Sequence, residues 1–148
     1  MDMDKKLLLK DLCARLPYGV KVLYEGWDEK IEDYIDVVDT LYSVNLDGWV
    51  NVSKTDSEIN IEGVKPYLFP MSSMTEEKVY EFYYRFVADD ISFDDFVADY
   101  WNTNSLHKVM TTIDDVESIM DWYNKNHLDC RGLIPKGLAE DATGLNIY

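Results

Sequence analysis

The hydrophobic pattern of this chain switches from a helical period to a strand period and back again. Over residues 4–16, apolar residues recur every three or four positions, which predicts a short amphipathic helix. Its apolar positions are Leu8, Leu9, Leu12, Cys13 and Leu16. Pro17 ends this helix because the residue before a proline avoids the helical region, and Gly19 then leads the chain into β structure.

Alternating apolar and polar residues predict four or five short strands between residues 20 and 62. Residues 20–25 alternate cleanly, and residues 26–29 are predicted to form a loop. Residues 34–46 are long enough for a bent strand, in which two apolar parities predict a β-bulge near Val37-Val38. Its expected inward face is Val38, Thr40, Tyr42, Val44 and Leu46.

The dipeptide Asp47-Gly48 is the strongest hairpin signal in the chain, because it suits the positive φ angles of a tight turn. It predicts a return strand over 49–53, and residues 57–62 alternate again. A lone hairpin is marginal in water, so we expect these strands to form a small, bent antiparallel sheet. The preferred shape is an SH3-like barrel, and a meander covered by helices is the alternative.

The second half of the chain has a helical period. Three capping boxes each predict the start of a short helix: Ser73 with Glu76, Ser92 with Asp95, and Thr112 with Asp115. We expect the last residues to form an ordered loop with a helical turn near 135–142. The predicted fold is a single α+β domain over 1–148, with a helix in 1–19, a β subdomain in 20–62, a connector in 63–74 and a helical part in 75–148.

Negative charge is concentrated in two stretches of the chain. The formal net charge is −15. Residues 28–62 carry ten acidic residues against two lysines, a net of −8, and residues 75–121 carry twelve against three basic residues, a net of −9. Because phosphate contacts need Lys and Arg, this balance argues against direct binding to nucleic acid or to anionic lipid. No apolar stretch approaches the roughly 20 residues of a membrane span.

The sequence offers no assembled catalytic or metal-binding signature. His127 and Cys130 are close in sequence, but a structural zinc site needs about four ligands and the chain has two Cys and two His in total. We therefore expect a loop histidine beside a packed cysteine. The paired aspartates lack the spacing of an EF-hand loop. A carboxylate-pair hydrolase stays open, because such pairs are distant in sequence. We predict no metal, no cofactor and no enzymatic activity.

Two surfaces are candidates for binding a partner protein. The first is an acidic face made of Asp90, Asp94, Asp95, Asp99, Asp114, Asp115 and Asp121. Helical spacing would place several of these carboxylates about 5–6 Å apart, like the phosphates of a nucleic acid, so that the face could occupy a basic channel in another protein. In the alternative, the acid only solubilises the chain, and the interface is aromatic and made of Trp27, Trp49 and Trp101. A small-molecule site at the barrel mouth is a third, weaker hypothesis.

Three blocks of the sequence resemble a family of small, uncharacterised proteins from phages and prophages of gut bacteria. The blocks are residues 7–20 (LLLKDLCARLPYGV), 64–77 (VKPYLFPMSSMTEE) and 131–148 (RGLIPKGLAEDATGLNIY). The resemblance implies a phage protein in the cytoplasm of a bacterial host cell, and it carries over no activity or catalytic residue. By analogy with other small acidic phage proteins, it favours an anti-defence protein or an inhibitor of host nucleic-acid machinery. The acidic segments fall largely between the blocks.

Overall fold

The computed structural model describes residues 2–88, 91–98 and 116–148, and the chain divides into two compact units. The first unit is Met1–Met71 with Asn124–Tyr148, and the second unit is Ser72–Tyr123. Helices and strands occupy largely separate parts of the chain, which confirms the α+β class. The boundary at residue 72 falls inside the predicted connector 63–74. The expectation of a single domain stays a prediction.

The predicted N-terminal helix is confirmed as α1 (Met3–Arg15). Asp2 caps it, because its carboxylate accepts a hydrogen bond of 2.8 Å from the backbone N–H of Lys5. A 3₁₀ turn, η1 (Leu16–Tyr18), contains Pro17 and is followed by Gly19 in the left-handed region at φ 67°. Leu8 and Leu12 are buried and anchor the helix in the core of the first unit.

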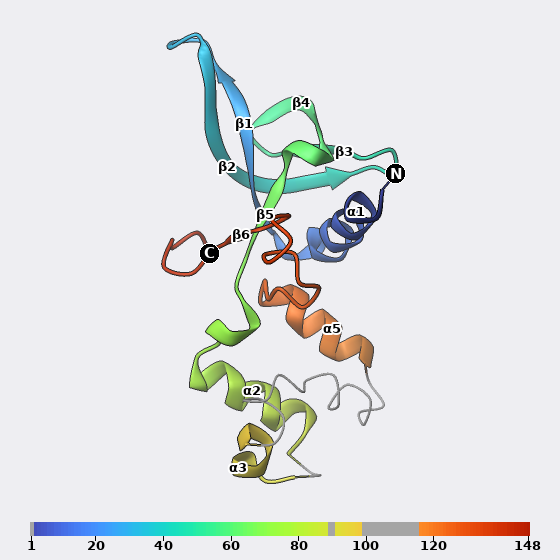
Figure 1. Cartoon of the computed structure of the whole chain (residues 1–148), viewed down its shortest axis with the longest axis vertical. Coiled ribbons are helices and arrows are strands. Elements are labelled where there is room, and N and C mark those ends of the chain that lie inside the picture. Colours follow the sequence, from blue (N-terminus) through green and yellow to red (C-terminus); the bar gives the residue numbers. More distant parts are fainter. Residues whose placement is uncertain (1, 89–90, 99–115) are drawn as a thin grey trace. The chain divides into compact units, whose positions relative to one another are not determined.

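The first unit contains a six-stranded sheet in the order β4-β3-β2-β1-β5-β6 (Figure 1). The strands are β1 (Lys21–Asp28), β2 (Asp33–Val44), β3 (Trp49–Val52), β4 (Thr55–Asn60), β5 (Lys65–Leu68) and β6 (Glu140–Asp141). Strands β1 to β4 form an antiparallel meander, and β5 returns to pair with β1. Both expected shapes, the SH3-like barrel and the meander, share this connectivity, and no pairing between described strands closes the sheet.

The C-terminal segment departs from the prediction. β6 pairs with β5 in parallel, with Tyr67 opposite Glu140, so the sheet is mixed and not purely antiparallel. The direction of β6 is not fixed by a tight turn, because about seventy residues separate it from its partner strand. The predicted helical turn near 135–142 was also wrong. Turns replace it, and Asp129 holds their start by accepting hydrogen bonds of 2.7 and 2.9 Å from the backbone of Leu133 and Ile134.

The predicted bulge and inward face of β2 were wrong. The pairing of β2 with β1 is continuous through Val37 and Val38, and the register shift lies between Leu41 and Ser43 against β3. Leu41 is buried whereas Tyr42 is 73% exposed. Before the register shift, the residues of β2 that face the core are therefore those expected to face away from it. The shift then lets Val44 pack against the same core. The hairpin at Asp47-Gly48 is confirmed, with Gly48 at φ 88°.

The second unit contains α2 (Glu76–Phe86) and α3 (Phe93–Phe96), and α5 (Val116–Lys125) runs across its C-terminal boundary. Ser92 caps α3 as predicted, by accepting a hydrogen bond from the backbone of Asp95. The cap of α2 is Thr75 and not Ser73, because the helix begins two residues later than expected. Thr112 and Asp115 lie outside the described residues. The core of this unit is aromatic, since fully buried Phe82 stacks on Phe96 and Tyr123.

Candidate functional site

The outer part of the β1–β2 hairpin is a two-stranded ribbon that pairs with itself. Its cross-strand pairs run from Tyr24 opposite Val37 to Asp28 opposite Asp33. In the described part of the chain, β5 pairs with β1 only at residues 22 and 23, and β3 pairs with β2 only over 41–44. Figure 1 shows this ribbon extending beyond the other strands of the sheet. We call residues 24–37 the arm.

The arm presents an aromatic pair to solvent. Trp27 and Tyr34 are directly opposite in the register, and their ring centroids are 5.2 Å apart with an interplanar angle of 74°. The two side chains are 56% and 62% exposed. Residues 26–29 were predicted to be a loop, but the strand continues to Asp28 because Gly26 allows a close approach. A Cβ at Gly26 would lie 3.0 Å from Cγ2 of Val37.

In the arm, acidic residues of one strand also lie directly opposite acidic residues of the other. Glu25 is directly opposite Asp36, and Asp28 is directly opposite Asp33. The arm contains six acidic residues and one basic residue, Lys30, which is a net charge of −5. Side chains in such pairs have Cβ atoms about 4.5–5.5 Å apart, and like charges there are destabilising. No described ion pair neutralises any of the six carboxylates.

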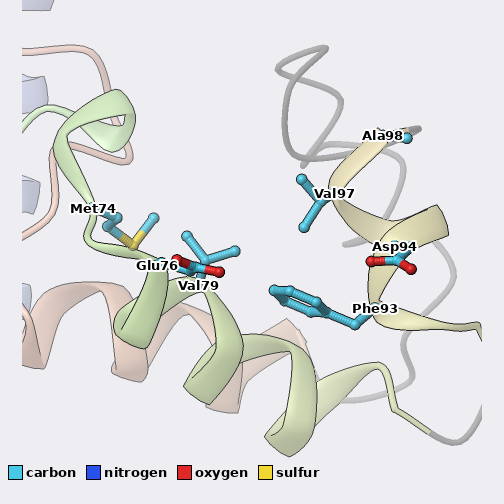
Figure 2. A pocket seen from close by; sticks show the side chains of 7 residues that line it. All are labelled: Met74, Glu76, Val79, Phe93, Asp94, Val97 and Ala98. Atoms are coloured by element: carbon cyan, nitrogen blue, oxygen red, sulfur yellow. The ribbon is translucent and has the colours of Figure 1, made fainter.

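The predicted acidic face is only partly described. Asp94 and Asp95 are exposed in the first turn of α3, and Asp121 is exposed on α5. The remaining four acids, Asp90, Asp99, Asp114 and Asp115, lie outside the described residues, so the expected row of carboxylates stays a prediction. Asp94 borders a hollow with Glu76 (Figure 2). The other lining residues, Met74, Val79, Phe93, Val97 and Ala98, are apolar and offer no nucleophile.

The predicted aromatic surface is also divided. Trp49 is 40% exposed at the start of β3, and Trp101 lies outside the described residues. The partner that the structure gives Trp27 is Tyr34, which the sequence reasoning missed. The sequence contained a signal for this pair, because a hairpin turn centred on residues 30 and 31 places positions 27 and 34 opposite each other. Assigning Trp27 to a loop hid that register.

The segment from His127 to Cys130 is held by buried charged groups. Arg15 is completely buried and donates to the backbone carbonyl of Leu128 at 2.6 Å. Burial raises the pKa of the Cys130 thiol, and burial with the nearby Arg15 charge lowers the pKa of His127 to about 4. Neither group is therefore primed for nucleophilic or base chemistry at neutral pH. In the described part of the chain, no three His, Cys, Asp or Glu side chains are grouped to hold a metal ion.

The blocks that carry the family resemblance meet in the first unit. Asp11 of the first block accepts from Arg131 of the third at 2.8 Å. Tyr67 of the second block accepts at its backbone carbonyl from the hydroxyl of Tyr148, also at 2.8 Å. The blocks thus contact one another and contribute part of the core of the unit, and the segment between the first and second blocks contributes the rest. The acidic arm lies in that intervening segment.

No protein-family model, curated protein or solved structure matches this chain. Within residues 2–88, 91–98 and 116–148, no helix is long and apolar enough to span a membrane.

Proposed function

We propose that this chain is a non-enzymatic, phage-encoded binding protein that acts as a nucleic-acid mimic in the cytoplasm of a bacterial host cell. It occupies the basic surface of a host protein that handles nucleic acid or defends against phages. The observation that carries the proposal is the arm, in which six exposed or half-exposed carboxylates without an ion-pair partner lie on a ribbon paired only with itself.

The arrangement of charge supports this proposal over direct binding to nucleic acid. The two strands of the arm carry two acids each, and the turn between them carries two more, so negative charge runs along both sides of the ribbon, as phosphates do along a duplex. A basic channel would attract such a surface over a distance and speed its capture. Phosphates themselves would be repelled.

A second candidate function is an adaptor module whose acid is only solubilising. The exposed aromatic pair Trp27–Tyr34 favours it, because aromatic side chains are enriched in the cores of protein interfaces. The two functions differ in their response to salt. Exposed charges are screened beyond about 8–10 Å at physiological ionic strength, whereas aromatic docking barely changes.

The test is capture of partners from a lysate of the bacterial host by the full chain, at about 50 mM and about 200 mM salt. We expect basic, nucleic-acid-handling proteins that are lost at the higher concentration. Two variants with the same change in charge identify the surface involved. One changes four arm acids to amides (Glu25, Asp28, Asp33 and Asp36), and the other changes Asp90, Asp94, Asp95 and Asp99 to Asn. Capture that survives in both variants, or that resists salt, favours the adaptor function and contradicts the mimic.

A further inference from the structure

One face of the arm combines aromatic rings with carboxylates. The pairs Trp27–Tyr34 and Glu25–Asp36 are two residues apart along each strand, so they lie on the same face of the ribbon. Val22 and Tyr24 belong to the opposite face and are buried in the core. The aromatic and acidic face is therefore the one directed away from the core of the first unit. We call it the outer face of the arm.

Among cations, the guanidinium group of arginine fits this outer face best. It is planar, binds a carboxylate through two parallel hydrogen bonds, and stacks on aromatic rings. Trp and Tyr rings attract a cation placed within about 6 Å of the ring centroid. The lysine ammonium is a compact, strongly hydrated point charge, so it gains less from the rings.

The charge of the arm excludes other occupants. A second copy of this chain would bring a net charge of −5 against a net charge of −5 if the two outer faces met. A nucleic acid or an anionic membrane would be repelled for the same reason. The remaining match is a protein surface with a high density of positive charge.

We propose that the outer face of the arm binds arginine side chains on the basic surface of a partner protein. This inference rests on the proposed function and assigns its chemistry to four residues, Trp27, Tyr34, Glu25 and Asp36. Glu25 and Asp36 repel each other in the free protein because they are directly opposite. A guanidinium group between them removes that repulsion, so the arm is more stable when occupied than when free.

The experiment measures binding of the full chain to two fluorescent peptides by anisotropy. The peptides have the same length and charge, and one is rich in arginine and the other in lysine. We expect the arginine peptide to bind several-fold more tightly, because only the guanidinium stacks and pairs at once. Trp27→Ala with Tyr34→Ala should abolish this preference. Glu25→Gln with Asp36→Asn should weaken the arginine peptide about tenfold, the scale of a single good interfacial contact.

Two controls separate this binding from bulk charge and from unfolding. Asp56→Asn with Glu58→Gln makes the same change of charge at exposed positions of β4 and should weaken binding less than about threefold. Glu25→Gln with Asp36→Asn should leave the melting temperature unchanged or raise it, because it removes a repulsive pair. Weaker binding in a more stable protein is a signature that loss of folding cannot produce.

Equal affinity for the two peptides, or equal loss in the arm and β4 variants, would overturn the inference. The proposed function would then still be decided by the lysate experiment, where the Asp90, Asp94, Asp95 and Asp99 variant reports on a different acidic surface. Capture that depends on that surface alone supports the proposed function while rejecting the arm.

Discussion

Asp11 and Arg15 lie one turn apart on α1, and both side chains are completely buried, with 2.9 Å between the carboxylate and Nε of the guanidinium. The same carboxylate accepts from Arg131 at 2.8 Å. One carboxylate therefore forms ion pairs with two guanidinium groups, one of which has no access to water. A buried charge that loses its partner is costly, so the stability of the first unit depends on Asp11.

Asp11→Ala should lower the free energy of unfolding by about 3–5 kcal/mol, because it leaves the buried Arg15 uncompensated. Urea titration followed by circular dichroism measures the loss. Asp4→Ala is the matched control on the same helix, since Asp4 forms an exposed ion pair with Lys136 at 3.7 Å. Its cost should stay below about 1 kcal/mol. Equal losses in the two variants would contradict the role assigned to Asp11.

His127 should make the protein less stable in mild acid. Its ring stacks on Tyr148 with centroids 3.8 Å apart, and its folded pKa is about 4 against an ordinary value of 6.5. Protons therefore bind the unfolded chain more readily between these values. The contribution is present above pH 6.5 and is lost as the pH falls toward 4. Because the ring is partly exposed and solvent screens its charge, we expect a loss of about 1–2 kcal/mol.

Unfolding free energies at pH 7 and pH 4.5 test this contribution. His127→Asn removes the titration, and Asn tolerates the positive φ of 56° at this position. The variant should show a smaller difference between the two pH values, whereas His107→Asn, at the other histidine of the chain, should retain the wild-type difference. The reverse pattern would assign the effect to His107.

Asp39 should make the stability of the protein depend on pH in a lower range than His127 does. Burial alone would raise the pKa of Asp39, but hydrogen bonds from the Ser53 hydroxyl and from the backbone of Lys54 and Thr40, with the Lys54 charge, lower it below 3.8. Because the folded pKa is depressed, this stabilisation is present above about pH 4 and is lost as the pH falls through the folded pKa.

Asp39→Asn should therefore cost about 1–3 kcal/mol at pH 7, because an amide cannot accept all of these hydrogen bonds. The difference from wild type should shrink at pH 3, because below the ordinary carboxyl pKa of 3.8 protons bind the unfolded wild-type chain more readily than the folded one. Urea unfolding at the two pH values measures it. Asp56→Asn, an exposed acid of β4, is the control and should have little effect at either pH. A cost for Asp39→Asn that is constant with pH would refute this account.

Two glycines form a matched pair for a test of backbone strain. Gly19 has φ 67° and no atom within 4 Å of an added Cβ, so Gly19→Ala should cost about 1–2 kcal/mol through the backbone alone. Gly63 lacks a positive φ, and an added Cβ would only touch Ile59 at 4.0 Å. Gly63→Ala should be neutral or stabilise by about 0.4–1 kcal/mol through the unfolded chain. Thermal melts compare them, and a similar shift in both would refute the assignment.

Local chemistry made much of the fold predictable. Pro17 and Gly19 end the first helix where expected, and Asp47-Gly48 turns the hairpin, because each acts within a few residues of itself. The inward parity of β2 failed because Asp39, a polar residue, is buried at 3% exposure among hydrogen-bond donors that come from the β3–β4 turn. The alternation of apolar and polar residues cannot reveal a buried polar residue whose hydrogen-bond donors are distant in sequence.

The candidate site was predictable in composition but not in position. The excess of acid was visible, yet the arm depends on which strands remain unpaired beyond residue 24, and that is a property of the whole sheet. The buried charges had a local signal. Asp11 and Arg15 have i, i+4 spacing on the same stripe as Leu8 and Leu12, which placed two opposite charges inside the apolar face of α1.

Because the two strands of the arm pair only with each other, the sequence of the arm can be exchanged while the rest of the sheet is kept. No hydrogen bond of the described sheet joins residues 25–36 to any strand other than their own partner. Apart from Gly26, where a Cβ would lie 3.0 Å from Cγ2 of Val37, their identity can therefore change without disturbing the packing of the core. The ribbon can also be lengthened or shortened by one residue on each strand while the register below it is kept. Different tips grafted on the same base would give proteins that share one scaffold and recognise different targets.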